Sequence, residues 1–161
     1  MTGLHTTGLP ENLNPRSEFK YKPPVNMICS ETNIRIRYSE TDKMGYLHHA
    51  NYLNYFEIGR TEMLRDMGLT YREMEEEGIL LPVLSVNINY YAPSFYDDVL
   101  TVKTFMKQKP GIKVFFEYEI YNEHSVLICT GNSTLVFIDA RSRKPRRPPD
   151  YFLEKFAAEF K

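Results

Sequence analysis

Residues 38–57 read YSETDKMGYLHHANYLNYFE, and the rest of the chain is organised around them. The stretch begins where a predicted strand ends and finishes inside a long amphipathic helix. The loop between strand and helix holds Asp42, Gly45, His48 and His49. A carboxylate beside a helix N-terminus can support acyl chemistry, because the free N–H groups and the positive end of the helix dipole stabilise a developing oxyanion.

The periodicity of apolar residues on either side predicts this strand and this helix. Apolar and polar residues alternate over residues 32–38, which predicts a strand with Ile34, Ile36 and Tyr38 on one face. Apolar residues then recur at steps of three and four, which predicts a helix over residues 51–67 with Asn51 as its N-cap. Gly59 in the middle of this helix predicts a close approach by a neighbouring backbone.

Beyond Pro82 the apolar period changes to two. It predicts strands over residues 83–91, 99–107, 113–122 and 125–138, joined as an antiparallel meander. Small residues such as Gly131 on the core-facing side of the last strand leave room for the long helix. One helix covers only one face of such a sheet, so the other face or edge needs a partner, most simply a second copy of the chain.

The ends of the chain add no second domain. Residues 1–30 contain repeated Gly and Pro without an apolar period and are predicted to be an extended or disordered leader. Residues 31–161 are predicted to form a single domain that ends in a helix over residues 151–160. The segment 141–147 is basic and proline-containing, so it is expected to be neither helix nor central strand.

Composition excludes several classes of function. A net charge of -1 argues against a nucleic-acid-binding protein. No apolar run is long enough for a membrane span. Cys29 and Cys129 lack metal-site spacing and are expected to be reduced thiols of a cytoplasmic protein. The four histidines lack metal-ligand spacing, and no GxSxG, P-loop or GxGxxG motif is present.

The candidate residues each have a structural alternative. Asp42 could be a loop aspartate that makes a turn beside Gly45, or a functional carboxylate placed near the helix start. His49 could be a surface residue or a polar group satisfied within the fold. Glu57 could be a second acid or base, or the ion-pair partner of Arg60 or Arg35. The basic segment 141–147 could bind phosphate or be a solvated linker.

Two motifs carry a resemblance to a known family. Residues 38–62 follow the pattern YxETDxxGxxxHAxYxxYFExxRTE, and residues 86–98 follow VxxxYxAPxxxDD. With these motifs the chain resembles the hotdog-fold acyl-CoA thioesterases of the 4-hydroxybenzoyl-CoA thioesterase class, and within that class the Tol-Pal-system-associated subgroup. The resemblance implies an α+β hotdog fold, in which a curved five-stranded antiparallel sheet wraps one long central helix.

The resemblance also implies an activity, the hydrolysis of an acyl thioester to free acid and thiol. Asp42 would attack the thioester carbonyl or activate water for that attack. The backbone N–H at His49 would polarise the carbonyl, and the His49 side chain would help to orient water or substrate. Tyr46 and Leu47 would line the acyl entrance.

The rest of the substrate and the assembly follow from the same resemblance. Coenzyme A or acyl carrier protein would carry the acyl group, so no separate cofactor and no metal are expected. Arg143 and Arg146 in the basic segment are candidates for the CoA phosphates. The family works as homodimers, often as dimers of dimers, with the pantetheine arm between two subunits. A hotdog dehydratase and a hotdog protein that binds acyl thioesters without turnover are the alternatives.

Overall fold

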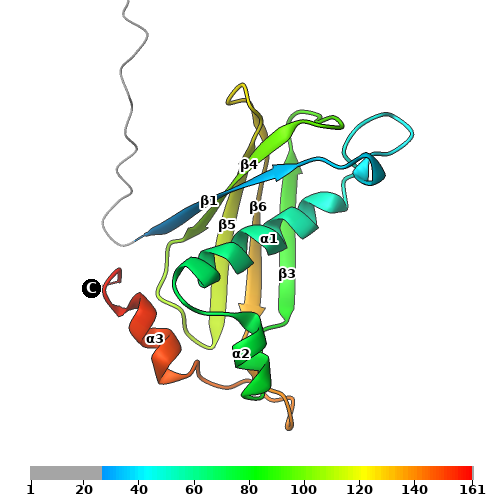
Figure 1. The fold of residues 1–161 in the computed structure, drawn as a ribbon. Helices are drawn as coiled ribbons and strands as arrows, with labels where there is room; N and C mark the ends of the chain where they lie inside the picture. Colours follow the sequence, from blue (N-terminus) through cyan, green and yellow to red (C-terminus); the bar gives the residue numbers. More distant parts are fainter. Residues whose placement is uncertain (1–26, 161) are drawn as a thin grey trace, which may run out of the picture.

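The computed structural model describes residues 27–160, so the first 26 residues of the predicted leader lie outside the described residues. A curved antiparallel sheet of five strands carries one long helix, α1, across one face (Figure 1). This arrangement confirms the predicted α+β class. The elements are, in chain order, β1 (Ile28–Arg35), the 3-10 turn η1 (Tyr38–Glu40), α1 (Asn51–Asp66), α2 (Tyr71–Glu76), β2 (Ile79–Leu80), β3 (Val83–Tyr90), β4 (Val99–Met106), β5 (Lys113–Tyr121), β6 (Leu127–Val136), β7 (Ile138–Asp139) and α3 (Asp150–Ala157).

The strands lie across the sheet in the order β1-β4-β5-β6-β3. Only β4, β5 and β6 form a meander, so the prediction that β3 and β4 are neighbours is wrong. β3 pairs instead with β6, and β1 pairs with β4. The physical reason is the connection over residues 91–98. It is too long for a tight hairpin, and it carries the chain from β3 at one edge of the sheet past β6 and β5 to β4.

The first strand also differs from its prediction. β1 starts at Ile28, within the predicted leader, and ends at Arg35 rather than at Tyr38. Ile36 is buried as predicted, but Tyr38 lies in η1 with 79% of its surface exposed. The alternation stops because the chain turns back on itself, with the Glu40 N–H donating to the Arg37 carbonyl oxygen (3.0 Å).

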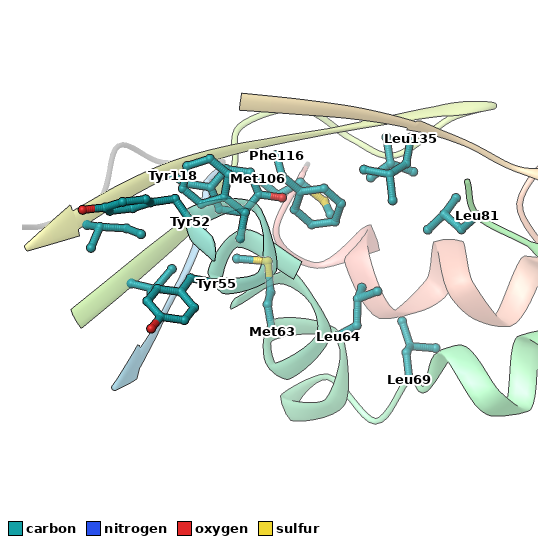
Figure 2. Packing of buried hydrophobic residues seen from close by; sticks show 14 of the residues in the cluster. Tyr52, Tyr55, Met63, Leu64, Leu69, Leu81, Met106, Phe116, Tyr118 and Leu135 are labelled. Atoms are coloured by element: carbon teal, nitrogen blue, oxygen red, sulfur yellow. The ribbon is translucent and has the colours of Figure 1, made fainter. Parts of the chain in front are cut away.

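The core lies between α1 and the sheet. Tyr55 and Met63 of α1 belong to the same buried hydrophobic cluster as Phe116 and Tyr118 of β5 (Figure 2). Each of these four side chains is at most 1% exposed. Burying a large side chain of this kind contributes about 1.5–3 kcal/mol, so the packing of α1 on the sheet holds the fold together.

Two glycines set how closely α1 approaches the sheet. A Cβ atom at Gly131 of β6 would lie 2.4 Å from the ring of Phe56, a residue of α1. The predicted space on the last strand is therefore confirmed, and Phe56 fills it. A Cβ atom at Gly59 would lie 2.5 Å from Oγ1 of Thr104. The close approach predicted at Gly59 is thus present, but a side chain of β4 makes it rather than a backbone.

The remaining elements lie at the end of the sheet toward which α1 runs (Figure 1). β2 and β7 form a two-stranded sheet, and α3 covers three residues fewer at its C-terminal end than the predicted helix. Cys29 and Cys129 are both free thiols, as predicted. Within residues 27–160, no helix is long and apolar enough to cross a membrane.

Candidate active site

The loop between η1 and α1 is folded into a tight turn around Asp42. The Asp42 N–H donates to the Tyr46 carbonyl oxygen and the Gly45 N–H donates to the Asp42 carbonyl oxygen, both at 2.9 Å. Gly45 has a φ of +80°, which a glycine adopts without strain. The Asp42 carboxylate uses Oδ1 to accept from the Met44 N–H (2.8 Å). Asp42 therefore does make a turn, and its Oδ2 accepts no hydrogen bond from the described residues.

The start of α1 presents a free donor beside this turn. The N–H of His48 donates to the Glu40 carbonyl (2.9 Å), and the N–H of Asn51 donates to the His48 carbonyl (2.9 Å). The N–H of Ala50 donates to Nδ1 of His48 (3.3 Å). The N–H of His49 has no acceptor within residues 27–160, and the residue is exposed. It stands at the positive end of a 16-residue helix, where a donor can bind an anion.

The Asn51 side chain does not have the predicted role. Ala50 occupies the N-cap position of α1 and makes no side-chain cap, so the prediction of Asn51 as the cap is wrong. Asn51 is the first helical residue, and its Nδ2 donates to the Glu40 carbonyl oxygen (2.8 Å). The side chain therefore ties the start of α1 to η1, and its Oδ1 accepts from Nδ2 of Asn54 (3.4 Å) rather than from a backbone N–H of the first turn.

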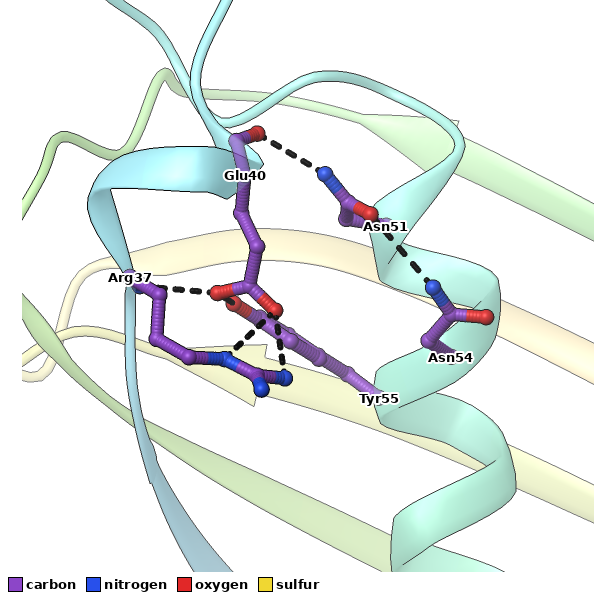
Figure 3. A network of polar contacts seen from close by, with 5 residues as sticks. All are labelled: Arg37, Glu40, Asn51, Asn54 and Tyr55. Carbon is purple, nitrogen blue, oxygen red and sulfur yellow. Dashed lines mark hydrogen bonds and ion pairs between the residues drawn. The ribbon is translucent and has the colours of Figure 1, made fainter.

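Glu40 is the buried polar centre of this region (Figure 3). Its Oε2 accepts from the Arg37 N–H and from the Tyr55 hydroxyl, both at 2.8 Å. Its Oε1 accepts from Nη2 of Arg37 at 2.9 Å and from Nε at 3.2 Å. Burial opposes ionisation, but these hydrogen bonds and the Arg37 charge outweigh it and lower the pKa of the Glu40 carboxyl. For Tyr55, burial and the Glu40 carboxylate both raise the pKa of the hydroxyl, so Tyr55 stays a donor.

The two predicted acyl-entrance residues face different ways. Tyr46 is 39% exposed, and its ring meets the ring of Phe95 edge to face, with 5.5 Å between the centroids. Leu47 is 4% exposed and belongs to the hydrophobic core. Tyr46 is therefore placed at the surface beside the Asp42 turn, whereas the Leu47 side chain packs into the core and attaches the turn to it.

The end of β3 and the β3–β4 connection contribute residues to which the sequence assigned no role. The Tyr90 hydroxyl donates to the His49 carbonyl (3.0 Å). The Ser94 carbonyl accepts from the Leu47 N–H (2.8 Å). The second motif, residues 86–98, was the available signal, because it contains Tyr90 and surrounds Ser94. What the sequence could not supply was the return of this connection to the Asp42 loop.

Arg143 and Arg146 lie far from Asp42 within one chain. The loop that follows β7, orange in Figure 1, is at the opposite end of the molecule from the cyan loop that precedes α1. Arg146 is among the residues that line an open cleft of about 590 Å³ there, together with Lys144 and Arg147. The described chain therefore does not bring the basic segment to the candidate active site.

Glu57 is the ion-pair partner of Arg60, one of its predicted alternatives. Oε2 of Glu57 and Nη2 of Arg60 are 3.0 Å apart, and the Arg60 side chain is only 8% exposed. Nε of Arg60 also donates to the Tyr71 hydroxyl (3.3 Å). These three residues line a cleft of about 450 Å³, and Val83, the first residue of β3, also lines it.

A metal centre finds no support in the described part of the chain. No group of three or more His, Cys, Asp and Glu side chains in residues 27–160 is placed to hold a metal ion. The chemistry available at the Asp42 loop is that of a carboxylate oxygen and a helix N-terminal N–H: attack on, or delivery of water to, a polarised carbonyl.

Known proteins resemble the chain along most of its length. A family model described as the thioesterase-like superfamily matches residues 36–156. The Bacillus subtilis protein YneP is 40% identical over 119 residues, which are 74% of this chain and 86% of that protein. The acyl-CoA thioester hydrolase YbgC of Escherichia coli is 31% identical over 137 residues, 85% of this chain and 99% of that protein.

Solved structures share the fold. The DHNA-CoA thioesterase of Staphylococcus aureus superposes with a TM-score of 0.76 and 36% identity, over 81% of this chain and 89% of that chain. The DHNA-CoA thioesterase Slr0204 of Synechocystis superposes with a TM-score of 0.75, but at 20% identity this likeness concerns the fold alone.

Proposed function

This chain belongs to the thioesterase-like superfamily, and we propose that it is an acyl-CoA thioesterase that hydrolyses an acyl thioester to free acid and CoA thiol. One observation carries the proposal: the Asp42 loop joins a carboxylate with an open oxygen to the start of α1, where the His49 N–H has no acceptor within residues 27–160. Both features stand on the part of the chain that the family model covers.

Asp42 supplies the oxygen for the chemical step. As a nucleophile, Oδ2 adds to the thioester carbon, the C–S bond breaks, and water then hydrolyses the resulting anhydride and returns the carboxylate. As a general base, Oδ2 instead takes a proton from the water that attacks the same carbon. Either route releases one acid and one thiol. The Met44 N–H, which donates to Oδ1, fixes the orientation of the carboxylate in both.

The His49 N–H supplies the complementary donor. Negative charge develops on the carbonyl oxygen as the nucleophile adds, and a fixed N–H at the helix N-terminus stabilises that charge more than it stabilises the neutral carbonyl. Removing one such donor from an oxyanion site costs on the order of 10²–10³-fold in turnover. The His49 ring is exposed beside this N–H, where it can orient water or substrate.

A homodimer through β3 completes the proposed site. β3 is one of the two edge strands of the sheet, and Val83, Leu84 and Val86 on it are each at least 37% exposed. An exposed apolar edge of this kind favours pairing with another strand. One end of β3 meets the Asp42 loop through Tyr90, and the other lines the Arg60 cleft through Val83.

Antiparallel pairing of two β3 strands about their middle therefore places the Asp42 loop of one copy beside the Arg60 cleft of the second copy. The acyl thioester would lie between the subunits, and a surface arginine pair, Arg143 and Arg146, would hold the CoA phosphates or acidic groups of acyl carrier protein. A dimer of dimers and a cytoplasmic location, which fits the two free thiols, belong to the same proposal.

Thiol release from a panel of acyl-CoAs with short, long and aromatic acyl groups tests the function. We expect release of free thiol from at least one of them, and loss of that release in the Asp42→Asn variant. Conversion of a 3-hydroxyacyl-CoA to the enoyl product without thiol release would establish a dehydratase instead. Binding without turnover of any CoA or acyl-carrier-protein thioester would establish a non-catalytic binding protein.

A further inference from the structure

Glu40 connects the Asp42 loop to α1 through both its backbone carbonyl and its side chain. Its backbone carbonyl accepts from the His48 N–H at 2.9 Å and from Nδ2 of Asn51 at 2.8 Å. Its carboxylate reaches α1 separately and accepts from the Tyr55 hydroxyl at 2.8 Å. Figure 3 shows Glu40 bonded to Asn51 and Tyr55 of α1. Glu40 precedes Asp42 by only two residues, so these bonds connect the Asp42 loop to the helix.

The surroundings of Glu40 hold it in one place. The residue is 7% exposed, and Tyr55 is fully buried. Arg37 donates to the Glu40 carboxylate from its backbone N–H and from its guanidinium, so both carboxylate oxygens have protein donors. Because a buried carboxylate needs donors on both oxygens, the Tyr55 hydroxyl and Arg37 leave it only one satisfied orientation.

Glu40 does not present its carboxylate to a substrate. The two oxygens face Arg37 and Tyr55, whereas the open oxygen of the loop belongs to Asp42. Any effect of Glu40 on turnover must therefore pass through the position of Asp42 and of the helix N–H groups. Displacement of a reacting group by about 1 Å can cost on the order of 10²-fold in rate, so such an effect is large enough to measure.

We propose that Glu40, held by the Tyr55 hydroxyl, is a positioning residue that sets the distance and angle between the Asp42 carboxylate and the N-terminus of α1. The inference rests on the proposed thioesterase function and adds a residue pair to it. The pair would act on the chemical step rather than on substrate binding, since neither side chain lies at the open surface.

Tyr55→Phe is the sharpest test, because it removes one hydroxyl and keeps the ring in the core. Tyr118→Phe is its matched control. The Tyr118 hydroxyl also makes a buried hydrogen bond, with Ser133 at 2.7 Å, but it joins two strands of the sheet. We expect Tyr55→Phe to lower kcat by about tenfold with little change in KM, and Tyr118→Phe to leave kcat unchanged. Both variants should be assayed well below their unfolding temperatures.

Glu40→Gln provides the second variant. It removes the negative charge that Arg37 and Tyr55 share, and we expect kcat to fall by on the order of 10²-fold. Because Tyr55 acts through Glu40, the double variant Glu40→Gln/Tyr55→Phe should be no slower than Glu40→Gln alone. In the Asp42→Asn background, Glu40→Gln should lose most of its effect on the residual turnover.

The outcomes separate this inference from the function on which it rests. Wild-type protein without thioesterase activity would overturn both. Activity that depends on Asp42 but is the same in Tyr55→Phe as in Tyr118→Phe would overturn the role of Glu40 and leave the function standing. An equal loss of kcat in both tyrosine variants, or a rise in KM alone, would also overturn it.

Discussion

The Tyr90 hydroxyl donates a hydrogen bond to the His49 carbonyl at 3.0 Å and so joins the last residue of β3 to the start of α1. The bond spans 41 positions of sequence. The His49 N–H is the proposed oxyanion donor, and two hydrogen bonds hold the backbone around it. One joins the His48 N–H to the Glu40 carbonyl, and the other joins the Tyr90 hydroxyl to the His49 carbonyl. A substitution at the end of β3 should therefore lower the rate of the chemical step.

Tyr90→Phe tests this connection. The variant loses one hydrogen bond to the residue that carries the oxyanion donor, so we expect a lower kcat and a stability loss of only about 0.5–1.5 kcal/mol. Tyr91→Phe is the control, because the Tyr91 hydroxyl bonds to Thr130 (3.0 Å) and not to the loop. Steady-state kinetics of the two variants compare the effects, and equal turnover would refute the connection.

Gly131→Ala should destabilise the protein. The new Cβ would lie 2.4 Å from the Phe56 ring and 2.7 Å from the Asn87 carbonyl oxygen, and the backbone oxygen cannot move aside cheaply. Overpacking of this kind costs about 1–3 kcal/mol. Urea denaturation measures the loss, and Gly111→Ala serves as the control because the nearest atom there is 3.9 Å away. Similar stabilities for the two variants would show that α1 does not lie tightly on β6.

The stability of the fold should decline in acid partly through Glu40. Its pKa is lower in the folded protein than the usual value of 4.5, so its ionised form favours folding. This contribution is complete above pH 4.5 and disappears as the pH falls through the lower, folded-state pKa. Glu40→Gln should therefore be less stable than wild type near neutral pH, with a difference that shrinks in acid. Denaturation midpoints across this range measure it, and a constant difference would contradict the assignment.

Val86→Lys should weaken the proposed dimer. A charge on the exposed edge strand opposes strand pairing, so the variant should have a lower mass in size-exclusion chromatography with light scattering, and lower activity. Phe115→Lys is the control, since Phe115 is also exposed, at 40%, but lies on β5 in the interior of the sheet. A dimer that is equally stable in both variants would place the interface elsewhere.

Most of the fold could be predicted from local pattern. The periodicity that gave α1 its bounds reflects burial against one sheet, and Gly131 reflects the space that Phe56 needs. The position of β3 could not be predicted this way, because its pairing with β6 depends on the path of residues 91–98. A strand's own residues specify which side is buried but not which strand lies beside it.

The candidate site was predictable to a similar degree. Asp42 and His49 stand out because a carboxylate and a helix start are close in sequence. Glu40 does not stand out, since a charged residue in a loop is usually exposed and its burial depends on Tyr55, 15 positions away. The separation of Arg143 and Arg146 from Asp42 is likewise a property of the folded chain alone.

The turnover of Asp42→Asn tests the central claim most directly. Asparagine keeps an oxygen that can accept from the Met44 N–H, so the loop should hold its shape, but it lacks the anionic oxygen that attacks or activates water. We predict that thiol release falls by on the order of 10²–10⁴-fold while the unfolding midpoint stays close to that of wild type. Turnover within a few-fold of wild type in a folded Asp42→Asn variant would contradict the role assigned to Asp42.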